Sequence, residues 1–325
     1  YIPVKGYKFA PDPADVAGAV ELLLKAEKPL IYAGEGVIYA GASAALKEFA
    51  ELANTPVIST LKAKGAFPED HPLFVGVRGD QVDHYLGECD LLFAVGSSLS
   101  PGRFTHGIPG AVNKTIVHCT IDELHVNKTY PTAQAVIGDA KFALQALTAE
   151  MSAKTSGNGR PAGKVAAEVK SVRESAMVKY REAMASTEKP INPYKVYAGL
   201  MEALDPHNSF LTHESGNTRD QLSTVYDTLV PRALLGWGNV SSLGFSFAAT
   251  IAATFASTIA ATVAATIAAT IATTVAATVA ATRRPLRGHS AATPRPLRGH
   301  SAATPRLLRG HLKVISRVES LARTE

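Results

Sequence analysis

The chain has 325 residues, with 33 Lys and Arg against 28 Asp and Glu, a net charge of +5. Residues 283–325 alone hold ten of the basic residues against two acidic ones, so the other 282 residues carry a net charge of −3. The basic character belongs to one repetitive segment, and no nucleic-acid-binding surface is therefore predicted. Cys89 and Cys119 are the only cysteines, which excludes a disulfide scaffold or a multi-cysteine zinc site and favours a cytoplasmic setting.

Helical and strand patterns alternate from residue 14 to residue 150. Helices are predicted over residues 14–27, 43–53, 81–88 and 140–151, where apolar residues recur at helical spacing. Short apolar strands are predicted over residues 29–34, 56–61, 90–96 and 115–122. Wholly apolar strands that alternate with helices are typical of a parallel sheet covered on both faces. The predicted fold class is α/β, a doubly wound parallel sheet.

Composition divides the chain into five parts. Predicted in order are a central α/β domain over 1–151, a polar linker and charged helix over 152–190, the truncated start of a second α/β unit over 191–249, an Ala/Thr repeat over 250–282, and a disordered basic tail over 283–325. We expect the first part to fold cooperatively by itself, and residues 190–325 to show no cooperative transition.

The repeats do not have the pattern of a packed domain. Bulky apolar residues recur every fourth position from Ile251 to Val279, and an eleven-residue unit starting at Arg284 recurs at Arg295. On a helix a period of four drifts by about 40° per repeat, so no single face could dock on a core. The uncharged run has the length of a membrane span but few bulky residues, so a membrane location is not predicted, although aggregation is. Duplicated short DNA or a shifted reading frame explains such short repeats better than a solenoid.

Two glycine-containing turns follow predicted strands. Gly34 and Gly36 come after the first strand and Gly96 after the third, where open α/β sheets bind ligands and where glycine allows backbone N–H groups to approach a phosphate. Tight strand-to-helix turns are the other interpretation, and the favoured one. Asp122, after the fourth strand, has the position of a ribose ligand or of a helix cap. If the glycines serve a nucleotide, Gly36→Val is expected to abolish binding without unfolding the domain.

Eight segments occur in a fixed order along the chain: Lys28–Gly36, Lys64–Gly76, Cys89–Gly96, Ile121–Leu124, Ile137–Ala140, Asn192–Tyr194, Thr212–Gln221 and Gly236–Phe245. Together they resemble the acetolactate synthase-like thiamine diphosphate enzymes, the first five in the central domain and the last three at the start of the diphosphate-binding domain. The resemblance covers about residues 1–249.

The resemblance implies three α/β domains, a homo-oligomer and a cofactor held between subunits. It also implies roles for individual residues. Ser215, Gly216, Asn217 and Thr218 match the turn that contacts the diphosphate, while Gly238 and Leu243 match the glycine and bulky residue that meet the aminopyrimidine ring. Leu243 would either support the bent cofactor or be an ordinary core residue.

Other family features have no counterpart in this sequence. The Gly-Asp-Gly and Asn-Asn motif, whose oxygens hold Mg²⁺ in the family, would begin near residue 265, where the Ala/Thr repeat stands. The family's activating Glu belongs to a domain that would precede Tyr1. The parent activity implied is therefore that of a thiamine diphosphate-dependent carboligase or decarboxylase acting on a 2-oxo acid, with this chain an inactive fragment.

Two further interpretations stay open. The central domain holds FAD or ADP in some relatives, so a non-catalytic nucleotide-binding module or a relic scaffold is the alternative function. A membrane-associated or aggregating product dominated by its repeats is the third. His213 and Glu214, as neighbours on a strand, point to opposite faces and are expected at a solvated strand end. Metal binding by the repeated His289, His300 and His311 is not expected.

Overall fold

The computed structural model describes residues 8–102, 105–236, 244–246 and 248–250. The chain divides into two compact units, residues 1–245 and residues 246–325. Of the second unit, only residues 246 and 248–250 are described. The predicted positions Gly238 and Leu243, the eleven-residue repeats and nearly all of the Ala/Thr repeat lie outside the described residues.

The first unit opens with strands and helices in alternation. The elements of its sheet domain are α1 (Pro13–Lys25), β1 (Pro29–Ala33), α2 (Gly36–Tyr39), α3 (Ser43–Leu52), β2 (Val57–Ser59), η1 (Leu61–Ala63), β3 (Phe74–Gly76), α4 (Asp80–Glu88), β4 (Leu91–Val95), η2 (Ala111–Asn113), β5 (Thr115–Thr120), η3 (Glu123–His125), β6 (Gln134–Ile137) and α5 (Ala140–Lys154). The elements that follow are α6 (Val165–Met184), α7 (Pro193–Ala203), β7 (Leu211–His213), α8 (Asn217–Val225) and β8 (Leu234–Gly236).

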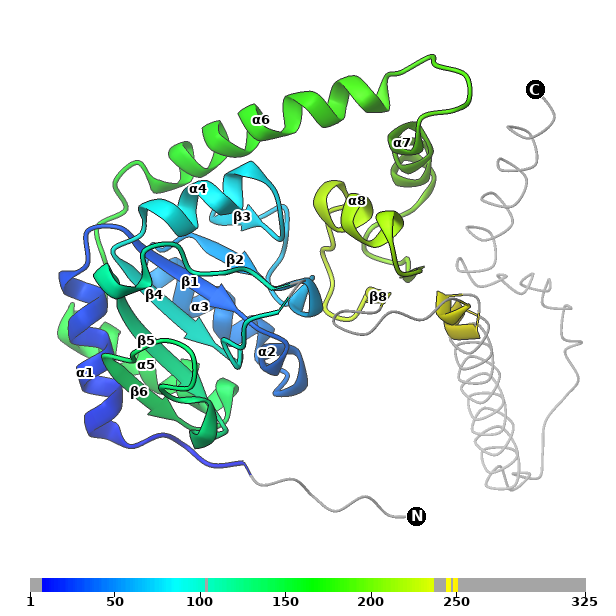
Figure 1. Ribbon diagram of the computed structural model, residues 1–325. Helices are drawn as coiled ribbons and strands as arrows, with labels where there is room; N and C mark the ends of the chain where they lie inside the picture. Colours follow the sequence, from blue (N-terminus) through cyan, green and yellow to red (C-terminus); the bar gives the residue numbers. More distant parts are fainter. Residues whose placement is uncertain (1–7, 103–104, 237–243, 247, 251–325) are drawn as a thin grey trace, which may run out of the picture. The chain divides into compact units, whose positions relative to one another are not determined.

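The six strands of the sheet domain form one parallel sheet in the order β3-β2-β1-β4-β5-β6 (Figure 1). Consecutive parallel strands need a crossover on one face or the other, and the order reverses direction between β1 and β4. The doubly wound α/β fold predicted for this part is confirmed. The last residues of β1 and β4, Ala33 and Val95, pair directly, so the two strands end level with each other.

Alternate residues of each strand point to opposite faces, and each face has its own core. On one face Ile31 and Phe93 pack with Phe49 of α3 and Leu144 of α5. On the other face Tyr32, Leu92 and Ile58 pack with α4, and Val169 of α6 joins them. Burial of both faces explains why these strands contain so few polar residues.

The strand count predicted from sequence is wrong: the sheet has six strands, and β3 and β6 were not predicted. β3 is only three residues long, too short for a detectable period. β6 begins at Gln134 and is only partly buried, as expected for an edge strand. The predicted second strand also ends early, at Ser59, because residues 61–63 form the 3₁₀ turn η1.

The segment predicted as a linker is packed against the sheet domain. Helix α5 continues to Lys154, past the predicted end. Arg160 then donates from its backbone N to Leu52 O at 3.0 Å and from Nη2 to Ala26 O at 2.7 Å. Gly159 lies so close to the Leu52 carbonyl that no side chain would fit there. These contacts hold residues 159–160 against the C-terminal ends of α1 and α3, before α6 begins.

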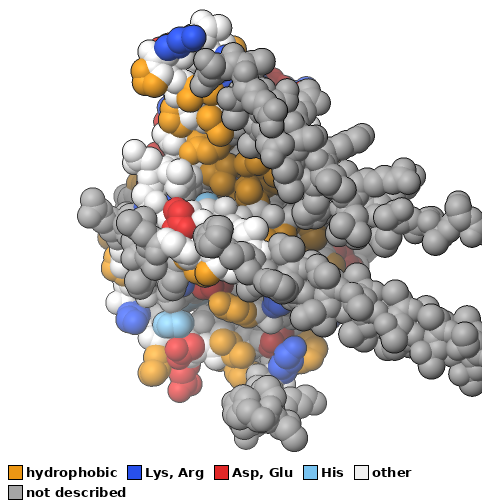
Figure 2. All heavy atoms as spheres, turned by 90° about the vertical axis from the view of Figure 1, so that its right-hand side faces the viewer, with side chains coloured by type: hydrophobic (Ala, Val, Ile, Leu, Met, Phe, Trp, Pro, Cys, Tyr) orange, Lys and Arg blue, Asp and Glu red, His pale blue; other side chains and the backbone are white. Residues whose placement is uncertain are grey.

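The elements after α6 form a smaller layer. β7 and β8 pair in parallel, and Tyr197 of α7 and Leu222 of α8 form a small core with Leu234. Helix α8 was not predicted, because only a turn was expected at its start. Figure 2 shows hydrophobic side chains gathered on the face that it presents. Among the described residues after α6, the large exposed apolar residues are Ile191, Val196, Phe210 and Leu235. No described helix is both long and apolar enough to cross a membrane.

Two fully buried histidines make the stability of the first unit pH-dependent. His118 on β5 and His213 on β7 are 1% and 5% exposed, and burial lowers the pKa of each below its ordinary value of 6.5. Their neutral forms are therefore favoured in the folded chain. The two neutral histidines contribute fully to the stability of the fold above pH 6.5. Below pH 6.5 this contribution falls as the pH falls, because the unfolded chain then binds more protons than the folded chain.

We expect the melting temperature to fall between pH 7 and pH 5, and the fall to be shallower in His118→Gln. His84→Gln, at an exposed position on α4, should leave the slope unchanged. Thermal unfolding followed by circular dichroism at half-unit pH steps measures these slopes. Equal slopes in parent and His118→Gln would show that His118 does not titrate in this range.

Candidate functional site

The sheet reverses its strand order at β1 and β4, and the predicted glycines lie at this point. Gly34 directly follows β1, Gly36 begins α2 and Gly96 directly follows β4. In open α/β sheets the crevice beyond the carboxyl ends of strands at such a reversal is where ligands bind. The structure therefore brings together the three glycines that the sequence analysis singled out.

The three glycines contact one another through their backbones. Gly34 N donates to Val95 O, and Gly36 N donates to Gly96 O, both at 2.8 Å. A Cβ at Gly36 would lie 2.8 Å from Gly96 Cα, and Gly96 has a φ of +64°. The tight-turn interpretation thus accounts for all three. The expectation that Gly36→Val would leave the fold intact is corrected, because valine would meet this backbone.

Asp122 acts as a cap in this structure. Its Oδ1 accepts a hydrogen bond from Leu124 N at 3.0 Å at the start of η3, and its Oδ2 lies 3.4 Å from His125 Nε2. This is the helix-cap alternative of the sequence analysis. A role with a ribose stays a prediction.

The Ser215–Thr218 turn joins β7 to α8. Gly216 has a φ of +91° and stands just before the helix, with no atom within 4 Å of where a Cβ would be. Thr218 Oγ1 donates to Glu214 O at 3.3 Å, which closes the turn. Gly216, Asn217 and Thr218 are exposed, and the first N–H groups of a helix have no intrahelical partner. Contact of this turn with a diphosphate stays a prediction.

His213 does not lie at a solvated strand end, and that expectation is corrected. Its ring is buried against Gly236 on the neighbouring strand β8, where a side chain would overlap it. Nδ1 lies 2.9 Å from the Glu214 carbonyl oxygen, so with its lowered pKa the neutral ring donates to that carbonyl. The His213 ring fits in this position because residue 236 is a glycine and has no side chain.

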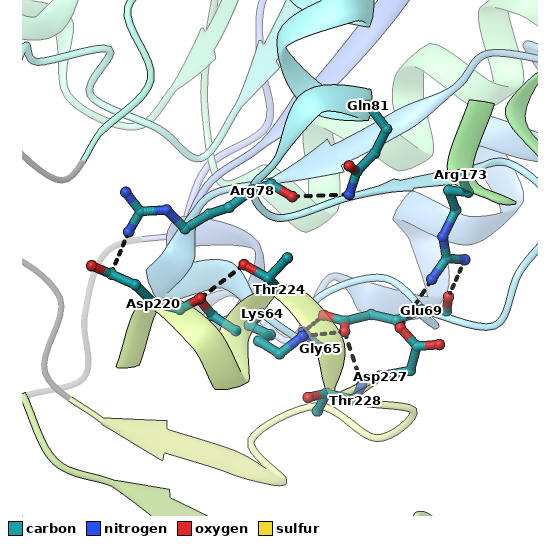
Figure 3. Close-up of polar contacts among 11 residues, drawn as sticks. Lys64, Gly65, Glu69, Arg78, Gln81, Arg173, Asp220, Thr224, Asp227 and Thr228 are labelled. Atoms are coloured by element: carbon teal, nitrogen blue, oxygen red, sulfur yellow. Dashed lines mark hydrogen bonds and ion pairs between the residues drawn. The ribbon is translucent and has the colours of Figure 1, made fainter. Parts of the chain in front are cut away.

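A buried ion pair lies where α8 meets the sheet domain (Figure 3). Glu69 is completely buried and its carboxylate pairs with the Lys64 ammonium, itself 3% exposed. The same carboxylate accepts from Gly65 N at 3.1 Å and from Thr228 N at 2.9 Å. Burial raises the pKa of Glu69, although the Lys64 charge and the Thr228 N–H oppose this.

Two arginines add to this junction. Arg173 of α6 donates to Glu69 O and to Asp227 Oδ1, both at 2.9 Å, and lies over the Phe74 ring at 5.4 Å. Arg78, between β3 and α4, donates to Asp220 Oδ1 at 2.6 Å. Between these contacts is a cavity of about 640 Å³ with walls from the 64–81 segment, α6 and the end of α8. Among the charged residues that line it, Lys64 pairs with Glu69 and Arg173 with Asp227.

The sequence analysis assigned no role to these junction residues. Lys64 and Glu69 were noted only within a segment that resembles the family. The segment from Leu61 to Val77 also contains Lys62, Asp70 and His71, so the sequence does not single out Lys64 and Glu69 as a buried pair. Charges are rarely fully buried unless paired. Thr228, which donates to Glu69, is 159 residues away from it, and Asp220 is 142 residues away from Arg78, so neither contact can be inferred from spacing.

Metal ligands are not evident in the described part of the chain. Among residues 8–102, 105–236, 244–246 and 248–250, no three His, Cys, Asp or Glu side chains gather closely enough to hold a metal ion. The family's Mg²⁺ motif was expected to have no counterpart here, and the position near residue 265 where it would begin lies outside the described residues.

The reversing parallel sheet defines a doubly wound α/β protein, and an open helix start follows it in the later layer. Residues 16–147 match the family model described as thiamine pyrophosphate enzyme, central domain. The chain is 32% identical over 273 residues to a probable acetolactate synthase large subunit from Methanocaldococcus jannaschii. It is 29% identical to glyoxylate carboligase from Escherichia coli O157:H7, and 28% identical to oxalyl-CoA decarboxylase from Escherichia coli K12.

The chain is thus similar to thiamine diphosphate-dependent enzymes over residues 16–147 and, over most of its length, to acetolactate synthase large subunits. The three alignments cover 77%, 77% and 73% of this chain but only 43%, 42% and 42% of the relatives, so the chain spans less than half of their length. The crystal structure of benzoylformate decarboxylase from Polynucleobacter necessarius shares the fold, with a TM-score of 0.58 over 75% of this chain and 44% of that one, at 19% identity.

The buried ion pair leads to a stability prediction. We expect Glu69→Gln to destabilise the first unit by about 3 kcal/mol or more, because Lys64 would be left as a buried charge without its partner. Glu88→Gln breaks a pair with Lys28 in which both side chains are more than half exposed, and should have little effect. Urea unfolding followed by fluorescence compares the two. Similar losses in both variants would contradict the assigned importance of the buried carboxylate.

Proposed function

We propose that residues 1–249 supply the central domain and the start of the diphosphate-binding domain of a thiamine diphosphate-dependent carboligase or decarboxylase acting on 2-oxo acids. The observation that carries this proposal is the order of two features. A central domain of this family is followed by a turn, Ser215–Thr218, that leads from a strand directly into a helix start.

Within this proposal the residues of the turn hold the diphosphate. The N–H groups at the start of α8 donate to its oxygens, and the helix dipole favours the negative charge. Gly216 allows the phosphate to approach the backbone, since no side chain stands there. Thiamine diphosphate, when bound, supplies the electron sink that loss of CO₂ from a 2-oxo acid requires. Homo-oligomer formation, as in the parent family, is part of the same proposal.

We further propose that the 325-residue chain does not catalyse this reaction by itself. The sequence from residue 250 to residue 282 is the Ala/Thr repeat, which offers no carboxylate or amide oxygen for the Mg²⁺ that the family uses. Without a metal the diphosphate charge would be met by the helix start alone. The chain would then bind the cofactor weakly and leave it unreactive.

This proposal predicts modest binding without turnover. Thiamine diphosphate at millimolar concentration should give a calorimetric signal that thiamine, which lacks the diphosphate, does not give. Asn217→Asp should abolish it by placing a carboxylate beside the phosphates, whereas Asn158→Asp, in the loop after α5, should not. Incubation with pyruvate, thiamine diphosphate and Mg²⁺ should release no CO₂ beyond a protein-free control. Sustained release would refute inactivity, and equal binding by Asn217→Asp would refute the diphosphate turn.

A second candidate function is binding of FAD or ADP by the central domain. It is favoured by the reversal of strand order at β1 and β4, with Gly34 and Gly96 at the two strand ends. Because these glycines pack closely, the N–H groups of Gly34 and Gly36 already donate hydrogen bonds to Val95 O and Gly96 O. Only modest affinity is therefore proposed.

We expect FAD or ADP to bind with a Kd no lower than tens of micromolar, about −6 kcal/mol. Because substitution of Gly36 would strain the backbone, Asp122→Asn is the better probe: it keeps a capping side chain but removes the carboxylate. Calorimetry should show weaker binding in this variant if Asp122 contacts a ribose. No heat with FAD, ADP or coenzyme A at millimolar concentration would leave a scaffold without a nucleotide site.

A further inference from the structure

Helix α8 is held near both ends by one short segment of the sheet domain, residues 64–78. Near its start, Asp220 Oδ1 accepts from Arg78 Nη1 at 2.6 Å. Just beyond its end, Thr228 N donates to the buried carboxylate of Glu69 at 2.9 Å. Figure 3 shows these two contacts on either side of the helix. The helix that follows the Ser215–Thr218 turn is therefore aligned by the sheet domain.

Asp220 connects Arg78 of the sheet domain to the first turns of helix α8. Besides Arg78, its carboxylate accepts from Arg219 Nε at 2.9 Å and Nη2 at 3.2 Å, and Arg219 is 3% exposed. The Asp220 carbonyl oxygen accepts from the hydroxyls of Ser223 and Thr224. Both the side chain and the backbone of Asp220 are thus fixed in the first turns of α8.

Arg78 is equally fixed on the side of the sheet. It lies between the end of β3 and Gly79, which has a φ of +105° and precedes α4. Its carbonyl oxygen accepts from Gln81 Nε2 at 2.9 Å, and Gln81 is 3% exposed. The guanidinium therefore reaches α8 from a backbone that is anchored in the sheet domain.

We propose that Arg78 is a positioning residue that sets the orientation of the Ser215–Thr218 turn through Asp220. The nature of the ligand at this turn rests on the proposed function; the positioning itself does not. Helix α8 has nine residues and a length of about 13 Å, and Glu69 holds its far end. Rotation by about 5° about that end would move the turn by about 1 Å, a displacement that matters for binding an anion by aligned N–H groups.

Hydrogen exchange of the free chain tests the positioning. In Arg78→Gln we expect amides of the 214–220 segment to exchange at least threefold faster, while amides of β1, β4 and residues 226–228 keep their rates. Arg78→Lys, which retains the charge, should recover part of the protection, and Asp220→Asn should reproduce the loss. The matched control is Lys179→Gln, which removes an ion pair of the same 2.6 Å length, with Asp80, that does not involve α8.

The possible results separate this inference from the proposed function. Unchanged exchange at 214–220 in both Arg78→Gln and Asp220→Asn would overturn the positioning role, whatever the turn binds. Equally increased exchange throughout the first unit, or the same increase in Lys179→Gln, would show a general loss of stability and would also overturn it. If exchange changes only at the turn but the parent chain binds no thiamine diphosphate, the positioning stands and the proposed function fails. If both hold, Arg78→Gln should weaken thiamine diphosphate binding severalfold with little change in melting temperature.

Discussion

The carboxylate of Glu69 is buried without contact with solvent, and the arrangement of the first unit depends on how it is satisfied. A carboxylate removed from water is costly unless it is paired and hydrogen-bonded. Here the Lys64 ammonium and two backbone N–H groups, of Gly65 and Thr228, surround it. Lys64 and Gly65 are near neighbours of Glu69 in sequence, but Thr228 is 159 residues away. Gly65 has a φ of +80°, and a Cβ there would lie 2.8 Å from Thr228 Cγ2, so the contact also requires glycine at this position. One acidic residue thus joins the segment between β2 and β3 to the segment after α8.

Helix α6 extends this junction along the edge of the sheet. Val169, near its start, is buried in the second core of the sheet domain, while Met177, Tyr180 and Met184 pack against the small core of the later layer. Between these two sets of contacts, Arg173 reaches both sides through Glu69 O and Asp227. The sequence predicts a charged helix here, and the structure shows that α6 contributes side chains to two cores. Composition set residues 152–190 apart from the domains on either side. The elements in this range pack against both the sheet domain and the later layer.

The sequence predicted what depends on local patterns and missed what depends on distant contacts. The doubly wound sheet followed from apolar strands such as Leu91–Val95, whose burial on both faces removes polar residues from the pattern. The strand Phe74–Gly76 was missed because it is short and no element was assigned to the residues around it. Helix α8 was missed because its residues are largely polar, and the distant partner of Asp220, Arg78, is not revealed by spacing. The sequence pattern correctly placed the three glycines at the ends of strands. It could not show that their backbones contact one another. The diphosphate role of the Ser215–Thr218 turn came only from the family resemblance, since a Ser-Gly-Asn-Thr sequence by itself indicates no more than a turn.

The sheet reversal and the segment that holds α8 lie at the same edge of the sheet. The sheet reversal lies at the carboxyl ends of β1 and β4, and Arg78 leaves the carboxyl end of β3 on the same edge of the same sheet. The charge of Arg78 helps lower the pKa of His106, whose ring contacts Tyr32 of β1, although burial is the main cause. The guanidinium of Arg78 is paired with Asp220, so the residue that leaves this edge of the sheet directs its charge to α8.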